Sequence, residues 1–220
     1  MAGHATDALS FALSTLTALF VVVDPFATVP LFVAITAGDS ENEKRRAARR
    51  ASVVAGATLA VFALTGALIF RMLGVSVGAF RIAGGILLFL LAVDMLSAQR
   101  SRQRTTPEEE AEGANKPDVS VFPLGIPMLA GPGATSTVMV LISRADGPYQ
   151  YVIVLTAIAV TLLATYWILR GASVLAQRLG HTGMNVLERI MGLILAAVAA
   201  QFVVDGIGLV WPRLVQGAAG

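Results

Sequence analysis

Long apolar stretches alternate with short polar segments along the whole chain. A helix needs ~20 mostly apolar residues to cross a bilayer, and six stretches reach about that length. They cover residues 9–37, 47–70, 75–98, 119–143, 149–169 and 186–210. The pattern therefore predicts an all-α polytopic membrane protein with six transmembrane helices.

The composition agrees with a membrane protein and disfavours several kinds of chemistry. Hydrophobic residues make up 56% of the chain and charged residues 14%, which leaves too little polar surface for a water-soluble globule. There is no cysteine, and the two histidines lie outside the apolar stretches, so we expect no metal site and no cofactor. The formal net charge is only +2 and the basic residues are scattered, so no nucleic-acid partner is expected.

The basic residues predict an orientation. When each Lys or Arg is assigned to the nearest polar segment, alternate segments carry twelve on one side of the membrane and four on the other. The positive-inside rule places the richer side in the cytoplasm, so both termini are expected outside. We interpret the basic run at 44–50 as part of this signal rather than as a lipid or partner site. No basic residue precedes the first stretch, which is therefore expected to be retained rather than removed as a signal peptide.

A polar segment separates two halves of similar length. Residues 99–118 carry four basic residues, four glutamates and Pro107, a composition that cannot bury a core. We predict a first three-span unit at 1–98, a cytoplasmic linker at 99–118 and a second three-span unit at 119–220.

Two short motifs recur in register in these halves. Residues 24–28 read DPFAT and residues 131–135 read GPGAT, at an offset of 107. Residues 81–87 read RIAGGIL and residues 189–195 read RIMGLIL, with five identities at an offset of 108. Because each half has three spans, the second half must cross the membrane in the opposite sense to the first. Such inverted repeats are typical of secondary transporters, whose substrate site lies near the midplane where the repeats meet.

Prolines interrupt the first and fourth spans near their midpoints. A proline in a helix interior costs ~3 kcal/mol or more, but proline is favoured as the first residue of a helix, after an Asp or Gly cap. Kinked but continuous helices are one alternative. Five prolines at two equivalent places favour discontinuous spans instead, with second half-helices that begin at Pro25 and Pro132. The prolines concerned are Pro25 and Pro30 in the first span and Pro123, Pro127 and Pro132 in the fourth.

The two predicted half-helices would direct their N-termini at one another near the bilayer centre. Backbone N–H groups and positive dipole ends at that point suit an anion such as a carboxylate. Asp24 lies at the same depth, so it is a candidate for binding a substrate ammonium group, for carrying a proton, or for capping the helix that follows. The nearby hydroxyls either contact a ligand or bond back to their own helices. The candidate substrate-binding residues are Asp24, Pro25, Phe26, Ala27, Thr28, Gly131, Pro132, Gly133, Ala134, Thr135, Ser136 and Gln201.

The remaining polar residues of the spans carry weaker signals. Gln201 is about midway along the sixth span, where an amide either links two helices or lines a pathway, and Asp205 lies one turn further outward. Arg81, Asp94 and Arg189 lie nearer span ends, where a side chain that reaches the interface or pairs with another charge there explains their presence.

Four segments resemble the MarC family of bacterial and archaeal inner-membrane proteins. They are FVVVDPFATVPLFVAIT, AFRIAGGILLFLLAVDML, VFPLGIPMLAGPGATST and RIMGLILAAVAAQFVVDGI, and the resemblance covers nearly the whole chain. It implies six spans, an inner-membrane location and, for the branch called SnatA, transport of small neutral amino acids such as glycine and alanine. The substrate region would fall on Asp24-Pro25 and Gly131-Pro132-Gly133. Many relatives read Asp-Pro-x-Gly-Asn-x-Pro where this chain has Ala27-Thr28, so no particular substrate is carried over.

The preferred hypothesis is a secondary transporter of small neutral amino acids across the inner membrane. Its expected partners are an amino acid and membrane lipids; a coupling proton or sodium ion and a homo-oligomer are compatible with it. An exporter of another small solute and a regulatory or structural subunit without transport are alternatives. An enzyme is disfavoured because the spans contain no Cys or Lys and no His to activate a nucleophile.

Overall fold

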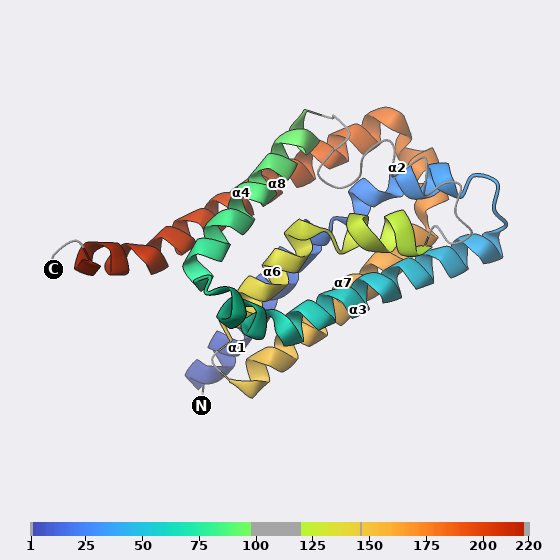
Figure 1. Ribbon diagram of the computed structural model, residues 1–220. Coiled ribbons are helices and arrows are strands. Elements are labelled where there is room, and N and C mark those ends of the chain that lie inside the picture. Colours follow the sequence, from blue (N-terminus) through green and yellow to red (C-terminus); the bar gives the residue numbers. More distant parts are fainter. Residues whose placement is uncertain (1, 98–119, 146, 218–220) are drawn as a thin grey trace.

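The computed structural model describes residues 2–97, 120–145 and 147–217, and every regular element in these ranges is a helix (Figure 1). In chain order they are α1 (Ala2–Val23), α2 (Pro25–Ile35), α3 (Glu41–Leu73), α4 (Val77–Leu96), η1 (Ser120–Leu129), α6 (Pro132–Ser143), α7 (Pro148–Arg170) and α8 (Ala172–Gly217). The predicted linker at 99–118 lies outside the described residues.

Among the described residues, five segments are long and apolar enough to cross a membrane. They are Asp7–Ile35, Glu41–Gly66, Val77–Leu96, Pro148–Arg170 and Thr182–Trp211. A sixth candidate is η1 followed by α6, which form a pair bent by 56° at a short break. The prediction of an all-α polytopic membrane protein is confirmed, with five candidate spans among the described residues, or six if the bent pair is one span.

Local polar contacts set the ends of the long helices. At the start of α3, Ser40 and Glu43 form a capping box: the backbone N–H of Ser40 donates to Glu43 Oε2 at 2.8 Å, and the N–H of Glu43 donates to Ser40 Oγ at 3.4 Å. Gly74 follows α3 with a φ of 64°, a conformation that glycine adopts without strain. Ser76 then caps α4 by accepting the N–H of Ala79 at 3.1 Å.

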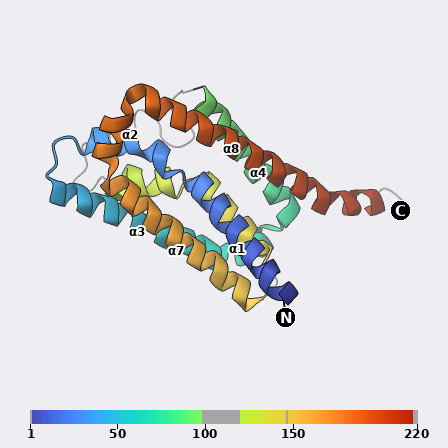
Figure 2. The same cartoon turned by 180° about the vertical axis from the view of Figure 1, so that it is seen from behind.

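The helices form two groups. α4 lies side by side with the later part of α8 in both views (Figure 1, Figure 2). In the other group α1 packs on α6 and α7, while α3 packs on η1, α6 and α7. α4 also contacts α6, so the fourth span joins the two groups. This contact brings α4 to the break between η1 and α6.

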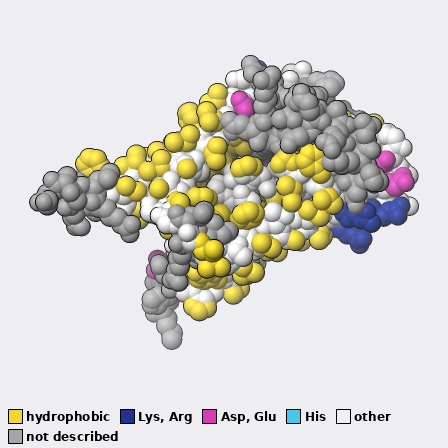
Figure 3. Space-filling view, viewed as in Figure 1, with side chains coloured by type: hydrophobic (Ala, Val, Ile, Leu, Met, Phe, Trp, Pro, Cys, Tyr) yellow, Lys and Arg dark blue, Asp and Glu magenta, His cyan; other side chains and the backbone are white. Residues whose placement is uncertain are grey.

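Small side chains let α3 pack closely, and large apolar ones cover the outside. Ala48, Ala51 and Ala55 form a buried stripe at helical spacing on the inner face of α3. Large side chains such as Leu64 and Leu193 are exposed. In Figure 3 hydrophobic side chains cover the visible middle of the molecule, whereas the basic side chains gather near the start of α3. This distribution suits a surface that faces lipid.

The last helix is longer than the sequence pattern predicts. The sixth apolar stretch covers 186–210, whereas α8 begins at Ala172 and changes direction at Gly180, where φ is 60°. The added first part contains good helix formers but also Gln and Arg, so it is helical without being apolar enough to extend the predicted span.

Candidate functional site

The first break lies between α1 and α2, at Asp24. Asp24 has a φ of 47°, is fully buried and accepts the N–H of Ala27 through Oδ1 at 3.2 Å. Its own N–H still donates to the carbonyl of Phe20 at 3.1 Å, which closes the last turn of α1. Pro25 follows as the first residue of α2. The predicted half-helix start is therefore confirmed, and Asp24 is its N-cap.

The second break lies between η1 and α6, at Gly131. Pro132 is the first residue of α6, as predicted, and Gly131 is the N-cap. A Cβ at position 131 would lie 2.5 Å from the carbonyl oxygen of Pro127, so the turn is too tight for any residue with a side chain. η1 is irregular as well, with extended backbone at Phe122 and Ile126. The fourth span therefore consists of two segments rather than one helix.

The two breaks are neighbours in space. α1 packs along α6, and a Cβ at Gly133 would lie 3.6 Å from Cγ1 of Val22, two residues before Asp24. The second break is also central in its span, because η1 has 10 residues and α6 has 12. Two breaks that are 107 residues apart in the chain thus lie close together, with Pro25 buried and Pro132 exposed.

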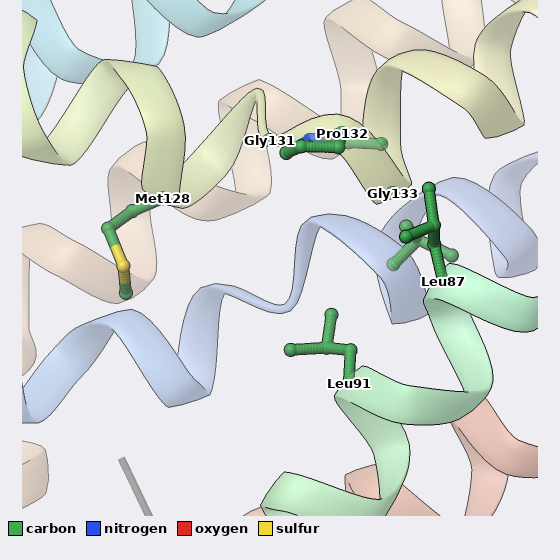
Figure 4. Close-up of a pocket in the computed structure, with 8 residues that line it drawn as sticks. Leu87, Leu91, Met128, Gly131, Pro132 and Gly133 are labelled. Carbon is green, nitrogen blue, oxygen red and sulfur yellow. The ribbon is translucent and has the colours of Figure 1, made fainter. Parts of the chain in front are cut away.

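A cavity of about 270 Å³ adjoins these breaks (Figure 4). Gly131, Pro132, Gly133 and Ala134 contribute the first turn of α6 to its wall. The other lining side chains are apolar and come from the end of α1, from α4 and from η1. They are Val22, Leu87, Leu91 and Met128.

The two helix N-termini at the breaks differ electrostatically. The positive end of α2 is capped by the carboxylate of Asp24, whereas Gly131 makes no side-chain hydrogen bond to the start of α6. Backbone N–H groups in the first turn of a helix have no acceptor within the helix. Pro132 has no N–H and the N–H of Thr135 donates to the carbonyl of Gly131 at 3.0 Å, so Gly133 and Ala134 are the first-turn residues whose N–H groups have no acceptor within the helix. With the positive end of the helix dipole beside the cavity, a small anion is favoured there.

The hydroxyl groups near the breaks bond back to their own helices. Thr28 donates to the carbonyl of Asp24 at 3.4 Å, Thr135 to that of Gly131 at 3.1 Å, and Ser136 to that of Gly133 at 3.0 Å. Of the two roles that the sequence left open for these hydroxyls, the structure has the local one. They shape the breaks by satisfying backbone carbonyls.

The predicted site residues separate into three groups. Gly131, Pro132, Gly133 and Ala134 line the cavity. A second group lies at the breaks but does not line the cavity. It contains Asp24, Pro25, Phe26, Ala27, Thr28, Thr135 and Ser136. Gln201 is elsewhere on α8, and its Nε2 donates to Oδ1 of Asp205 at 2.7 Å.

Sequence reasoning missed the apolar part of the wall. Leu87 and Leu91 are four residues apart on α4, which puts them on one helix face, but nothing in an apolar span distinguishes a cavity-lining leucine from a lipid-facing one. Met128 lies just before the second break and could have been proposed from that position. Among the described residues, no group of three His, Cys, Asp or Glu is placed to hold a metal ion.

The interpretation of Arg81 as an interfacial residue is wrong. Its position near the start of the third span suggested a side chain that reaches the membrane interface, but it is only 8% exposed. The reason is tertiary: α4 packs against α6 and α8, so the face of α4 that carries Arg81 is covered by protein, whereas Ala79 and Ala83 on other faces are exposed.

Comparisons with known proteins agree with these features. The MarC family model, described as "MarC family integral membrane protein", matches residues 9–210. The chain is 37% identical over 206 residues to the UPF0056 membrane protein YvbG of Bacillus subtilis, covering 93% of this chain and 98% of that protein. It is 38% identical over 191 residues to the UPF0056 membrane protein PH0760 of Pyrococcus horikoshii, covering 87% and 91% respectively.

A more distant relative gives the same result. The UPF0056 membrane protein YhcE of Escherichia coli is 32% identical over 198 residues, covering 90% of this chain and 92% of that protein. No solved structure matches the chain. The matches extend through all the described candidate spans, including both breaks, and the chain is a multi-pass integral membrane protein of the MarC family.

Proposed function

We propose that this MarC family protein is a secondary transporter of small neutral amino acids, and that its substrate binds in the cavity between the two helix breaks. The observation that carries the proposal is the uncapped first turn of α6 in the wall of that cavity. An apolar chamber that ends on free N–H donors selects a small ligand with one anionic group.

A zwitterionic amino acid fits the chemistry of this chamber. Its carboxylate would accept hydrogen bonds from the first-turn N–H groups of α6. Its ammonium group would be attracted toward the buried carboxylate of Asp24, two residues beyond the lining residue Val22. Leu87, Leu91 and Met128 leave an apolar volume of about 270 Å³, which favours a small side chain such as a hydrogen or a methyl group.

The contacts between α4 and α8 support an inverted repeat as the basis of alternating access. A Cβ at Gly85 would lie 2.8 Å from the carbonyl oxygen of Ala199, and a Cβ at Gly192 would lie 3.1 Å from that of Ala92. Gly192 and Ala199 lie 107 residues after Gly85 and Ala92, so the two contacts are equivalent between the two halves of the chain. The same offset relates the two proline breaks and is one residue from the offset of the RIAGGIL and RIMGLIL motifs. We infer a two-fold relation between three-span units at 1–98 and 119–220, one of which rocks against the other.

The proposal includes the membrane location of the protein, its orientation and its driving ion. We place it in the inner membrane with both termini outside and the linker at 99–118 in the cytoplasm, because twelve of the sixteen basic residues then face the cytoplasm. A proton or a sodium ion would drive transport, and Asp24 is the buried carboxylate that suits either role.

The test is uptake by the full-length protein in liposomes. Purified protein should move labelled glycine, alanine, serine or threonine when a proton or sodium gradient is imposed. Leu91→Trp should abolish uptake, because Leu91 lines the cavity and is 6% exposed. Leu90→Trp is the matched control, because its neighbour Leu90 is 45% exposed and does not line the cavity.

Two results would contradict the proposal. One is wild-type protein that is folded by size-exclusion chromatography but moves none of these amino acids under either gradient. The other is equal uptake by the Leu91→Trp and wild-type proteins, because a filled cavity cannot hold the substrate.

A further inference from the structure

A second polar cluster lies at the end of the helix assembly opposite the arginine-rich start of α3. It consists of Arg81 from α4, Arg144 directly after α6, and Gln201 and Asp205 from α8. Arg81 and Asp205, and with them the uncharged Gln201, fall within candidate membrane spans, where charged side chains are costly and mark functional sites by default. The central cavity does not include any of them.

The carboxylate of Asp205 is fully engaged in this cluster. Its Oδ2 forms an ion pair with Nη2 of Arg144, and its Oδ1 accepts Nε2 of Gln201 at 2.7 Å. The guanidinium of Arg144 also lies 5.8 Å from the ring centroid of Phe202, within the range of a cation–π interaction. Asp205 thus ties the end of α6 to α8.

Arg81 is the second cation of the cluster, and the carboxylate of Asp205 is paired with Arg144 rather than with it. It is 8% exposed, and its Nε has no hydrogen-bond partner among the described residues. Arg144 and Asp205 are both close enough to act on it electrostatically. The cluster therefore has two guanidinium groups and one carboxylate, which already has two partners. A structural ion pair between α6 and α8 would explain Arg144 and Asp205 but not a buried arginine beside them.

The cluster continues the interface that leads to the central cavity. A Cβ at Gly84 would lie 3.3 Å from Cβ of Ser136, and Cδ2 of Leu88 would lie 2.8 Å from a Cβ at Gly133. Arg81, Gly84 and Leu88 share a face of α4 at spacings of three and four residues. Along this face of α4, Leu88 is level with Gly133 of α6 and Gly84 is level with Ser136. Arg81 lies one turn further along, toward the end of α6 and the polar cluster.

We propose that Arg81 and Arg144 form a second anion-binding site, which receives the carboxylate of an amino acid at the outer end of the α4–α6 interface, and that Asp205 competes with the ligand for it. The inference rests on the proposed transport function and adds a residue pair that the family match does not assign. Guanidinium groups suit this role because they present several donors to a carboxylate. A ligand that displaces Asp205 from Arg144 also releases α6 from α8.

The first experiment measures glycine uptake in proteoliposomes. Arg81→Gln should raise the KM for glycine about tenfold or more, because a charged hydrogen bond to the carboxylate is lost. Arg189→Gln is the matched control, because Arg189 occupies the corresponding motif position on α8 but is exposed. Asp205→Asn should lower the KM, since the competing charge is gone, which a purely structural role of Asp205 does not predict.

The second experiment detects the site without transport. In a Leu91→Trp background, which fills the central cavity, acetate should still raise the melting temperature in detergent, and acetamide at the same ionic strength should not. Adding Arg81→Gln should abolish the acetate effect, and adding Asp205→Asn should strengthen it.

The outcomes separate the two proposals. If wild-type protein moves no amino acid, the proposed function fails. If wild-type protein transports glycine while Arg81→Gln leaves both its KM and the acetate effect unchanged, only the second site fails. Should Arg81→Gln not fold, Asp205→Asn decides: an unchanged or weakened acetate effect in that variant contradicts the inference.

Discussion

Replacing Gly131 with alanine tests whether the second helix break holds the shape of the site. The added Cβ would lie 2.5 Å from the carbonyl oxygen of Pro127. A carbon and a carbonyl oxygen approach to about 3.3 Å, so the turn must open by roughly 0.8 Å. Both partners belong to the backbone of one tight turn, so neither can rotate away as the end of a side chain would.

The expected loss of stability follows from this overlap. Forcing an extra methyl group into a packed site costs about 1–3 kcal/mol, and alanine is also a poorer N-cap than glycine. For a chain of this length, ~2–4 °C of melting temperature correspond to 1 kcal/mol, so we expect a fall of roughly 2–12 °C. The first turn of α6 moves with the break, so transport should fall about tenfold or more.

The assay pairs thermal unfolding in detergent with uptake in proteoliposomes. Gly208→Ala is the control. Gly208 lies in helix α8, and a Cβ at this position would have no neighbour within 4 Å. That variant should keep its activity and be as stable as the wild type or more so, since alanine is favoured over glycine in a helix by about 1 kcal/mol. If Gly131→Ala matched Gly208→Ala in both measurements, the break would not hold the site as described.

Three further changes test individual contacts. Asp24→Ala should lower the melting temperature, because it removes a helix cap worth ~0.5–2 kcal/mol and puts alanine at a φ of 47°; Asp24→Asn should keep the stability but lose transport, and full transport by Asp24→Asn would show that the charge is not needed. Gly85→Ala should destabilise by about 1–3 kcal/mol, because its Cβ would lie 2.8 Å from the carbonyl oxygen of Ala199, and an unchanged melting curve would contradict the α4–α8 packing. Ser40→Ala should cost ~0.5–2 kcal/mol at the start of α3 while uptake stays normal, and a loss of uptake would refute a purely structural role.

Several features were predictable because their causes are local. A continuous apolar stretch must be helical in lipid, since only a helix satisfies its own backbone there, and this located the spans. The half-helix starts at Pro25 and Pro132 follow from proline chemistry, because proline lacks the N–H that a helix interior needs but that its first turn does not. Asp24 as a cap follows from the preference of short acceptors for that position.

Tertiary packing decided what local rules leave open. Leu87 and Leu90 are equivalent in an apolar span, and only the contact of α4 with α6 turns Leu87 toward the cavity. The same contact buries Arg81, whereas Arg189, in the matching motif, is exposed. The sequence by itself determined which stretches are candidate membrane spans and where two of them break, because those properties depend on neighbouring residues. The position of the cavity and the meeting of Arg81, Arg144 and Asp205 depend on residues far apart in the chain, so they exist only once the helices have packed.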